Sequence, residues 1–205
     1  EGGMPMAQSF DTAGWFAPGP GLFRNVGAVL LEGESQRAAV QRLLVAEDAF
    51  AQADAEVAKV LRNFLARCAD RLPGPQPVTL APEGFDPWRN CVRVLQAFEV
   101  WQNYCEFVTR VRPALGPGIR ERMAFAASVT SEDADAARAA MARYREAIRR
   151  MIPPGTLVCL PTAPCIAPEI SIAGDALDVG HCLLAEVHGL DARIMQQSVH
   201  GLLVA

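Results

Sequence analysis

The stretch that decides how this chain folds is Met6-Ala7-Gln8-Ser9-Phe10-Asp11-Thr12-Ala13-Gly14-Trp15-Phe16-Ala17. Its Ser, Asp and Thr side chains readily bond nearby backbone amides, which favours a tight loop over a helix or a strand. Gly14 allows a positive φ there. We therefore predict that Asp11 fastens a turn and does no chemistry. The stretch has the character of a domain interior, and residue 1 is not Met. We expect the chain to be a fragment of a longer protein.

This loop resembles a motif of the amidase signature family, serine hydrolases that cut amide bonds. The family carries a similar Ser-x-Asp-Thr-x-Gly loop, and members with a "SFDT(V/A)GWFA" run are the most similar. Further similar segments follow in the family's order, over roughly positions 4 to 170: the helix Leu22 to Leu31, then Arg42 to Phe50, Gly118 to Arg122, and Leu160-Pro161-Thr162-Ala163-Pro164.

The resemblance implies an α/β fold in which this chain supplies part of a mixed β-sheet flanked by helices. It implies that the loop lies against the catalytic segment without taking part in catalysis. Ser9, Asp11, Thr12 and Gly14 are then structural supports of the site. We predict an amidase-like portion over 1–170 and a divergent tail over 171–205.

The residues that would carry out amide hydrolysis are not expected in this chain. The family uses a Lys and two Ser residues near a Gly-Ser-rich segment, which lies upstream of the loop. Lys59 is the only lysine here, and its helical context predicts a surface charge. None of the six serines has a serine neighbour or lies in a Gly-rich loop that could offer backbone donors to an oxyanion. We therefore assign no catalytic residue.

Composition excludes several classes of protein. At 51% hydrophobic and 20% charged residues the chain is neither disordered nor membrane-spanning, because no apolar run reaches roughly 18 residues. A net charge of -4 with dispersed arginines argues against a nucleic-acid partner. The six cysteines show no Cys-x-x-Cys spacing, so we predict buried free thiols and a cytoplasmic protein.

Apolar periodicity predicts helices that alternate with short strands. Thr130 with Asp133 three residues later forms a helix-starting capping box. In the helix before it we expect a core-facing stripe of Cys91, Val94, Phe98, Trp101, Cys105 and Val108. The predicted helices are 22–31, 51–70, 87–111 and 130–151, and the predicted strands are 43–46, 78–80 and 156–160.

Pro161 and Thr162 follow the last predicted strand. In open α/β sheets ligands gather beyond the carboxyl ends of strands, so both residues are candidates for a substrate-pocket wall. Equally, Pro161 and Pro164 merely end the strand. The three histidines lie in 171–205, and His181 and His188 lack a third well-spaced ligand, so no metal site is predicted. No cofactor motif is present, and the resemblance implies chemistry that needs no cofactor.

Three functions remain open from the sequence. The first and preferred one is the C-terminal part of an amidase, acting on a small-molecule amide once the missing portion completes it. The second is an inactive amidase-like binding module, as in organelle-import receptors whose amidase-like domain resembles this chain. The third is a degenerate fragment that would expose a sheet edge and aggregate. The oligomeric state and the particular amide are not determined by the sequence.

Overall fold

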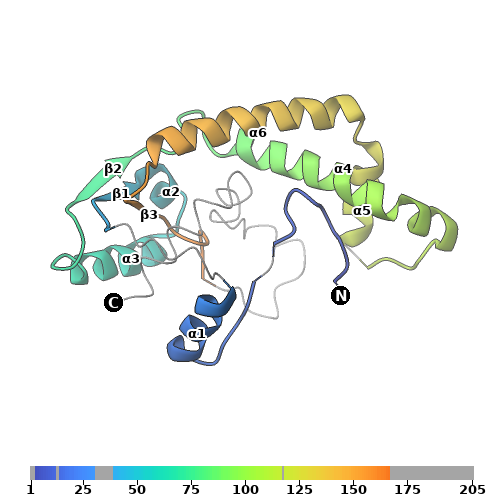
Figure 1. Cartoon of the computed structure of the whole chain (residues 1–205). Helices are drawn as coiled ribbons and strands as arrows, with labels where there is room; N and C mark the ends of the chain where they lie inside the picture. Colours follow the sequence, from blue (N-terminus) through green and yellow to red (C-terminus); the bar gives the residue numbers. More distant parts are fainter. Residues whose placement is uncertain (1–2, 13, 31–38, 117, 167–205) are drawn as a thin grey trace.

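A computed structural model describes residues 3–12, 14–30, 39–116 and 118–166 (Figure 1). Short strands and helices alternate along the chain, so the predicted α/β class is confirmed. The predicted tail 171–205, with its three histidines, lies outside the described residues. The elements in order are α1 (Pro20–Leu30), β1 (Arg42–Ala46), α2 (Glu47–Ala51), α3 (Ala55–Arg67), β2 (Pro75–Val78), α4 (Asp86–Val111), α5 (Ile119–Ser128), α6 (Ser131–Met151) and β3 (Thr156–Cys159).

The three strands form one parallel sheet in the order β2-β1-β3. The central strand β1 is buried from Leu43 to Ala46, as its continuous apolar run predicts for a strand covered on both faces. The strands predicted at 43–46 and 156–160 are found with small changes at their ends. β2 begins and ends earlier than the predicted strand 78–80, and it includes Pro75 and Pro77.

Helices α4 and α6 run in opposite directions side by side and extend beyond the sheet (Figure 1). The predicted capping box at the start of α6 is confirmed: Asp133 N–H donates to Thr130 Oγ1 at 3.1 Å, and Thr130 N–H donates to the Asp133 carboxylate at 3.0 Å. The buried face of α6 packs with α4 and the ends of β1 and β2 into one core. Its members are Ala46, Ala49, Leu80, Ala81, Phe85, Trp88, Cys91, Leu95, Ala137, Met141 and Ile148.

The buried face of α4 differs from the expected stripe. Cys91 is buried as predicted, but the other fully buried residues of the helix are Trp88, Leu95 and Glu99. The remaining stripe residues are only half-buried. Helix α6 and the N-terminal segment together cover one face of α4. This face is rotated about the helix axis from the predicted apolar stripe. Two further differences are that α2 and α5 were not predicted and that the predicted helix 51–70 is shorter, since α3 spans Ala55–Arg67.

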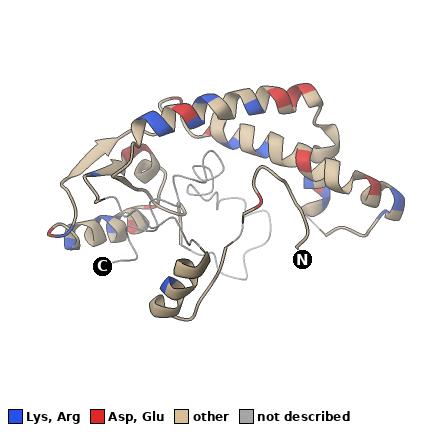
Figure 2. Cartoon of the chain, viewed as in Figure 1, with Lys and Arg blue, Asp and Glu red and all other residues tan. Residues whose placement is uncertain are grey.

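Helix α1 lies apart from this core and buries no residue (Figure 1). Trp15 packs against this helix: its indole N–H donates to the Phe23 carbonyl at 3.2 Å, and the centres of the Trp15 and Phe23 rings lie 5.2 Å apart. Leu22, Val29 and Leu30 of the same helix are exposed. Figure 2 shows that charges are dense on α6, whereas the sequence of α1 contains one charged residue, Arg24. None of the described helices is both long and apolar enough to cross a membrane.

Candidate functional site

Glu99 of α4 holds the N-terminal loop from inside the protein. Its side chain is buried, with 9% exposed, and it is the buried charged group among the described residues. Ser9 donates twice to it: the backbone N–H reaches Oε2 at 2.9 Å and the hydroxyl reaches Oε1 at 2.5 Å. A buried carboxylate needs such donors to offset its lost hydration. The Ser9 hydroxyl is therefore used to satisfy Glu99 and is not presented as a nucleophile.

Two neighbours of Glu99 on α4 extend this grip toward the start of the chain. Asn103 Nδ2 donates to the Met6 carbonyl at 3.0 Å, and the Tyr104 hydroxyl donates to the Pro5 carbonyl at 2.6 Å. Little more than one turn of helix thus makes four hydrogen bonds to residues 5–9. We call residues 5–11 the anchored loop.

Asp11 closes the anchored loop on itself. Its carboxylate accepts the backbone N–H of Met6 at 3.0 Å and that of Ala7 at 3.2 Å, so the side chain fastens a turn. Thr12 and Gly14 follow on the surface. Among the described glycines, positive φ angles occur at Gly84, Gly118 and Gly155 and not at Gly14, so the expected backbone conformation is not found there. That these residues support a catalytic site stays a prediction.

Asp48 ties together the carboxyl ends of two strands. It lies in the first turn of α2, two residues after the end of β1, and its Oδ2 accepts the N–H of Ala81, just beyond β2, at 2.8 Å. Its other oxygen, Oδ1, is buried without a partner among the described residues. Asp54, after α2, donates its N–H to the Pro164 carbonyl beyond β3 at 2.7 Å. These bonds fix the carboxyl ends of the strands, where parallel α/β proteins bind their ligands.

An ion pair joins α3 to α2 near the carboxyl end of β1. Arg62 Nη2 lies 2.6 Å from Glu47 Oε2, and its guanidinium stacks 4.5 Å from the centre of the Phe50 ring. The hydrogen bond from Arg62 lowers the pKa of the Glu47 carboxyl. Burial raises the pKa of the nearby Cys159 thiol, and the charge of Arg62 partly opposes that shift. Cys159 is therefore a protonated thiol at neutral pH.

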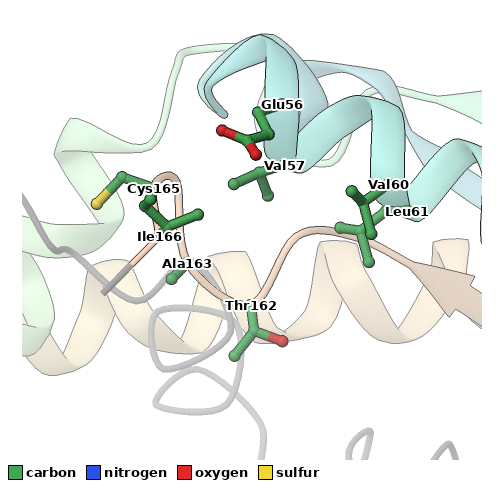
Figure 3. Close-up of a pocket in the computed structure, with 8 residues that line it drawn as sticks. All are labelled: Glu56, Val57, Val60, Leu61, Thr162, Ala163, Cys165 and Ile166. Atoms are coloured by element: carbon green, nitrogen blue, oxygen red, sulfur yellow. The ribbon is translucent and has the colours of Figure 1, made fainter. Parts of the chain in front are cut away.

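An open hollow of about 320 Å³ lies between α3 and the segment after β3 (Figure 3). The α3 side chains in it come from one face of the helix, and Thr162 lies at the opposite wall. Pro161 is fully buried and does not line it. Thr162 thus lies where a pocket wall was predicted, and its contact with substrate stays a prediction. The lining residues are Glu56, Val57, Val60, Leu61, Thr162, Ala163, Cys165 and Ile166.

The chemistry available at these places is limited. The hollow is lined mainly by apolar side chains, together with the Glu56 carboxylate, the Thr162 hydroxyl and the Cys165 thiol. Lys59 is exposed on α3 and does not line it. In the described part of the chain, no three His, Cys, Asp or Glu side chains are grouped to hold a metal ion. Sequence reasoning identified the anchored loop but missed Glu99, Asn103 and Tyr104. One signal was available, because Glu99 interrupts an apolar run between Phe98 and Val100.

Comparison with known proteins gives related chains, although no family model matches. The chain is 25% identical over 195 residues to Outer envelope protein 64, chloroplastic, of Arabidopsis thaliana, which covers 82% of this chain and 33% of that protein. It is 25% identical over 204 residues to Amidase 1 of the same plant, covering 85% of this chain and 48% of the relative. Amidase 1 of rice is 29% identical over 203 residues, covering 85% and 47%.

A solved structure has the same fold. A crystal structure of an amidase superposes with a TM-score of 0.77 at 18% identity, over 93% of this chain and 45% of that chain. The chain therefore spans less than half the length of each of these proteins. Shared fold and relatives named amidase lead to the same conclusion: this chain is related to the amidase family and corresponds to a part of its fold.

Proposed function

We propose that this chain is the C-terminal part of an amidase-type serine hydrolase that cleaves carboxylic amide C–N bonds. The catalytic Ser, Ser and Lys are then supplied by a portion that the 205 residues do not contain. The observation that carries the proposal is the alignment coverage. Two relatives named Amidase 1 each align with 85% of this chain, whereas the alignment covers only 47–48% of their own length.

In this proposal the chain builds one side of the site. Ser9 and Asp11 of the anchored loop, with Thr12 and Gly14 that follow it, face the catalytic portion, and four hydrogen bonds between the loop and α4 keep the loop in place. Thr162 forms part of the pocket wall, and buried Pro161 fixes the backbone before it. The substrate is a small-molecule amide. The chemistry uses hydroxyl, amine and backbone groups, so we propose no cofactor, and we propose a cytoplasmic location.

Two measurements test this function. Purified 1–205 should not hydrolyse an aryl amide and should not be labelled by a serine-directed fluorophosphonate. The natural protein, captured with an antibody against 130–150 of α6, should hydrolyse the aryl amide and react with the fluorophosphonate. Its mass should be roughly twice 22.1 kDa. Hydrolysis by 1–205 that the inhibitor abolishes would show that the catalytic residues are in this chain. A natural product of 22.1 kDa without a partner chain would contradict the proposal.

A binding module is the second candidate, because one relative is named an outer envelope protein and not an amidase. The exposed apolar side of α1 suits a binding role as well as an intramolecular one. The same measurements separate the two candidates. A natural protein that is longer than this chain, remains unlabelled by fluorophosphonate and turns over no amide would favour the binding module. Aggregation of natural 22.1 kDa material would favour a degenerate fragment.

A further inference from the structure

One face of α6 is turned away from α4 and from the sheet, and it is exposed from one end of the helix to the other (Figure 1). The buried residues Ala134, Ala137, Met141 and Ile148 lie on the face that packs against the core. The opposite face carries residues at spacings of four, three, four, three and four, which keeps them on one side of a helix. We call these residues the outer row, and all of them are exposed: Glu132, Ala136, Ala139, Arg143, Glu146 and Arg150.

The charge of α6 changes sign along the helix, as Figure 2 shows. Its first turn contains the acids Glu132 and Asp133, and its last turn contains the bases Arg149 and Arg150. This order complements the helix macrodipole, which favours acids at the N-terminus and bases at the C-terminus. The outer row therefore has a negative end at Glu132 and a positive end at Arg150.

The charges at the positive end of the outer row can be shared with a partner. Arg150 Nη1 lies 3.6 Å from Glu146 Oε1, one turn earlier in the same helix, and the two side chains are 72% and 69% exposed. Such an exposed pair contributes little to stability, because water and salt screen it. Arg150 can therefore exchange this contact for another carboxylate at little cost.

The outer row is complementary in charge to a second copy of itself when the two helices are antiparallel. In an antiparallel pair centred on Met141, each residue faces the one that lies equally far on the other side of the centre. Glu132 and Arg150 are both nine residues from Met141, so an acid faces a base at each end of the pair. In a parallel pair each Glu132 would face the other Glu132, and each Arg150 the other Arg150. Like charges placed opposite each other repel, so the row favours the antiparallel arrangement.

The middle of the outer row is complementary to itself in size. Glu146 and Ala136 are both five residues from Met141, and Arg143 and Ala139 are both two residues from it. Each long charged side chain in this part of an antiparallel pair therefore faces an alanine, so no two long side chains compete for the same space. The 21 residues of α6 offer a contact about 30 Å long. A pairing in which each copy uses the same surface is isologous, as in most protein dimers.

We propose that α6 is a self-association surface through which two copies of the chain form a symmetric dimer, with their outer rows antiparallel and Glu132 of each copy paired with Arg150 of the other. The occupant is a second copy because the order of charges and of side-chain sizes is complementary to itself about Met141. This inference does not rest on the proposed function, since α6 presents the outer row whether or not the natural chain is longer. It concerns assembly and not catalysis.

Sedimentation equilibrium of the purified natural chain tests whether the dimer forms. At about 100 µM the measured mass should be twice that of one chain, and dilution should dissociate the dimer. The dissociation constant should rise about 10-fold between about 0.05 and about 0.5 M NaCl, because salt screens exposed ion pairs. A natural chain that is monomeric at every concentration up to about 100 µM, or a dimer that salt does not weaken, would overturn the proposal.

Charge reversal in the natural chain tests which face of α6 pairs. Arg150→Glu sets two acids opposite each other at both ends of the dimer and should raise the dissociation constant about 10-fold or more. Arg149→Glu is the matched control. It makes the same change one residue away, about 100° around the helix from the outer row, and should leave the dissociation constant within about threefold of the parent's. Equal weakening by the two variants would mean that the outer row is not the contact surface.

A charge swap tests the antiparallel register. Glu132→Arg should weaken the dimer as Arg150→Glu does, and the double variant Glu132→Arg/Arg150→Glu should restore the parent's dissociation constant to within about threefold, because both intermolecular pairs form again with their charges exchanged. The double variant opposes the helix macrodipole more than either single variant does, so recovery of the dimer cannot come from a more stable helix. A double variant that dimerises as weakly as the single variants would overturn the pairing of Glu132 with Arg150.

Discussion

Replacing Glu99 by glutamine should loosen the anchored loop without unfolding the protein. The carboxylate accepts two hydrogen bonds from Ser9, at 2.9 and 2.5 Å, and hydrogen bonds to a charged group contribute about 1.5–3 kcal/mol each. Glutamine keeps the shape and one acceptor oxygen but turns its NH₂ toward a donor. We expect the free energy of local opening to fall by about 2 kcal/mol.

A change of this size raises the exchange rate of the Ser9 amide about 30-fold, since 1.4 kcal/mol corresponds to a factor of ten. Hydrogen exchange detected by NMR measures that rate in 1–205. Glu106→Gln is the matched control on the same helix: Glu106 is 83% exposed and 3.7 Å from Arg110, so its loss should change stability by less than about 0.5 kcal/mol.

If the Ser9 amide in Glu99→Gln exchanges within threefold of the parent rate, Glu99 does not hold the anchored loop. Ser9→Ala and the double variant complete a thermodynamic cycle. Because alanine removes the hydroxyl but keeps the backbone N–H, the coupling energy between Ser9 and Glu99 should be about 1 kcal/mol. Additive effects would mean that the two side chains do not interact in solution.

Three further variants or reagents probe the core and the helices. Leu95→Ala, in the core, should lower the free energy of unfolding by about 2–5 kcal/mol in urea titrations, while Leu22→Ala on exposed α1 should change it by less than about 0.5 kcal/mol. Thr130→Ala should destabilise by about 1 kcal/mol through the lost cap of α6. Hydrogen bonds from Thr130 lower the pKa of the Asp133 carboxyl below its ordinary value of 3.8, so the stability that they give to α6 is present above that pH and lost as pH falls. In an acid titration the free energies of unfolding of the variant and the parent should therefore converge. Burial raises the pKa of the Cys91 thiol, so alkylation of native protein should be slow, accelerate with alkaline pH and become fast only on unfolding; rapid labelling at neutral pH would contradict its burial.

Local signals predicted the elements that depend on neighbouring residues. The Thr130 and Asp133 capping box starts α6, the apolar run at Leu43 forms β1, and the prolines after Met151 end α6 before β3. Each of these is decided within a few residues by hydrogen bonding, periodicity or the missing N–H of proline. The loop around Asp11 was identified for the same reason.

Predictions that needed distant partners were less accurate. The stripe on α4 was placed by apolar spacing alone, but Leu95 and Glu99 are the buried residues beyond Cys91. Ser9 is 90 residues from Glu99 in the sequence, and their contact compensates the buried charge. Apolar spacing carries no information on such a partner, because the carboxylate is buried only where donors from another segment reach it.

The sequence by itself determined the α/β class and the order of most elements. It did so because backbone donors, caps and apolar periods are properties of adjacent residues. Only the tertiary structure decided that Glu99 anchors residues 5–11 and that Thr162 and not Pro161 lines the hollow. These depend on register and on contacts between segments far apart in the chain, which arise only when β1, β3 and α4 are packed together.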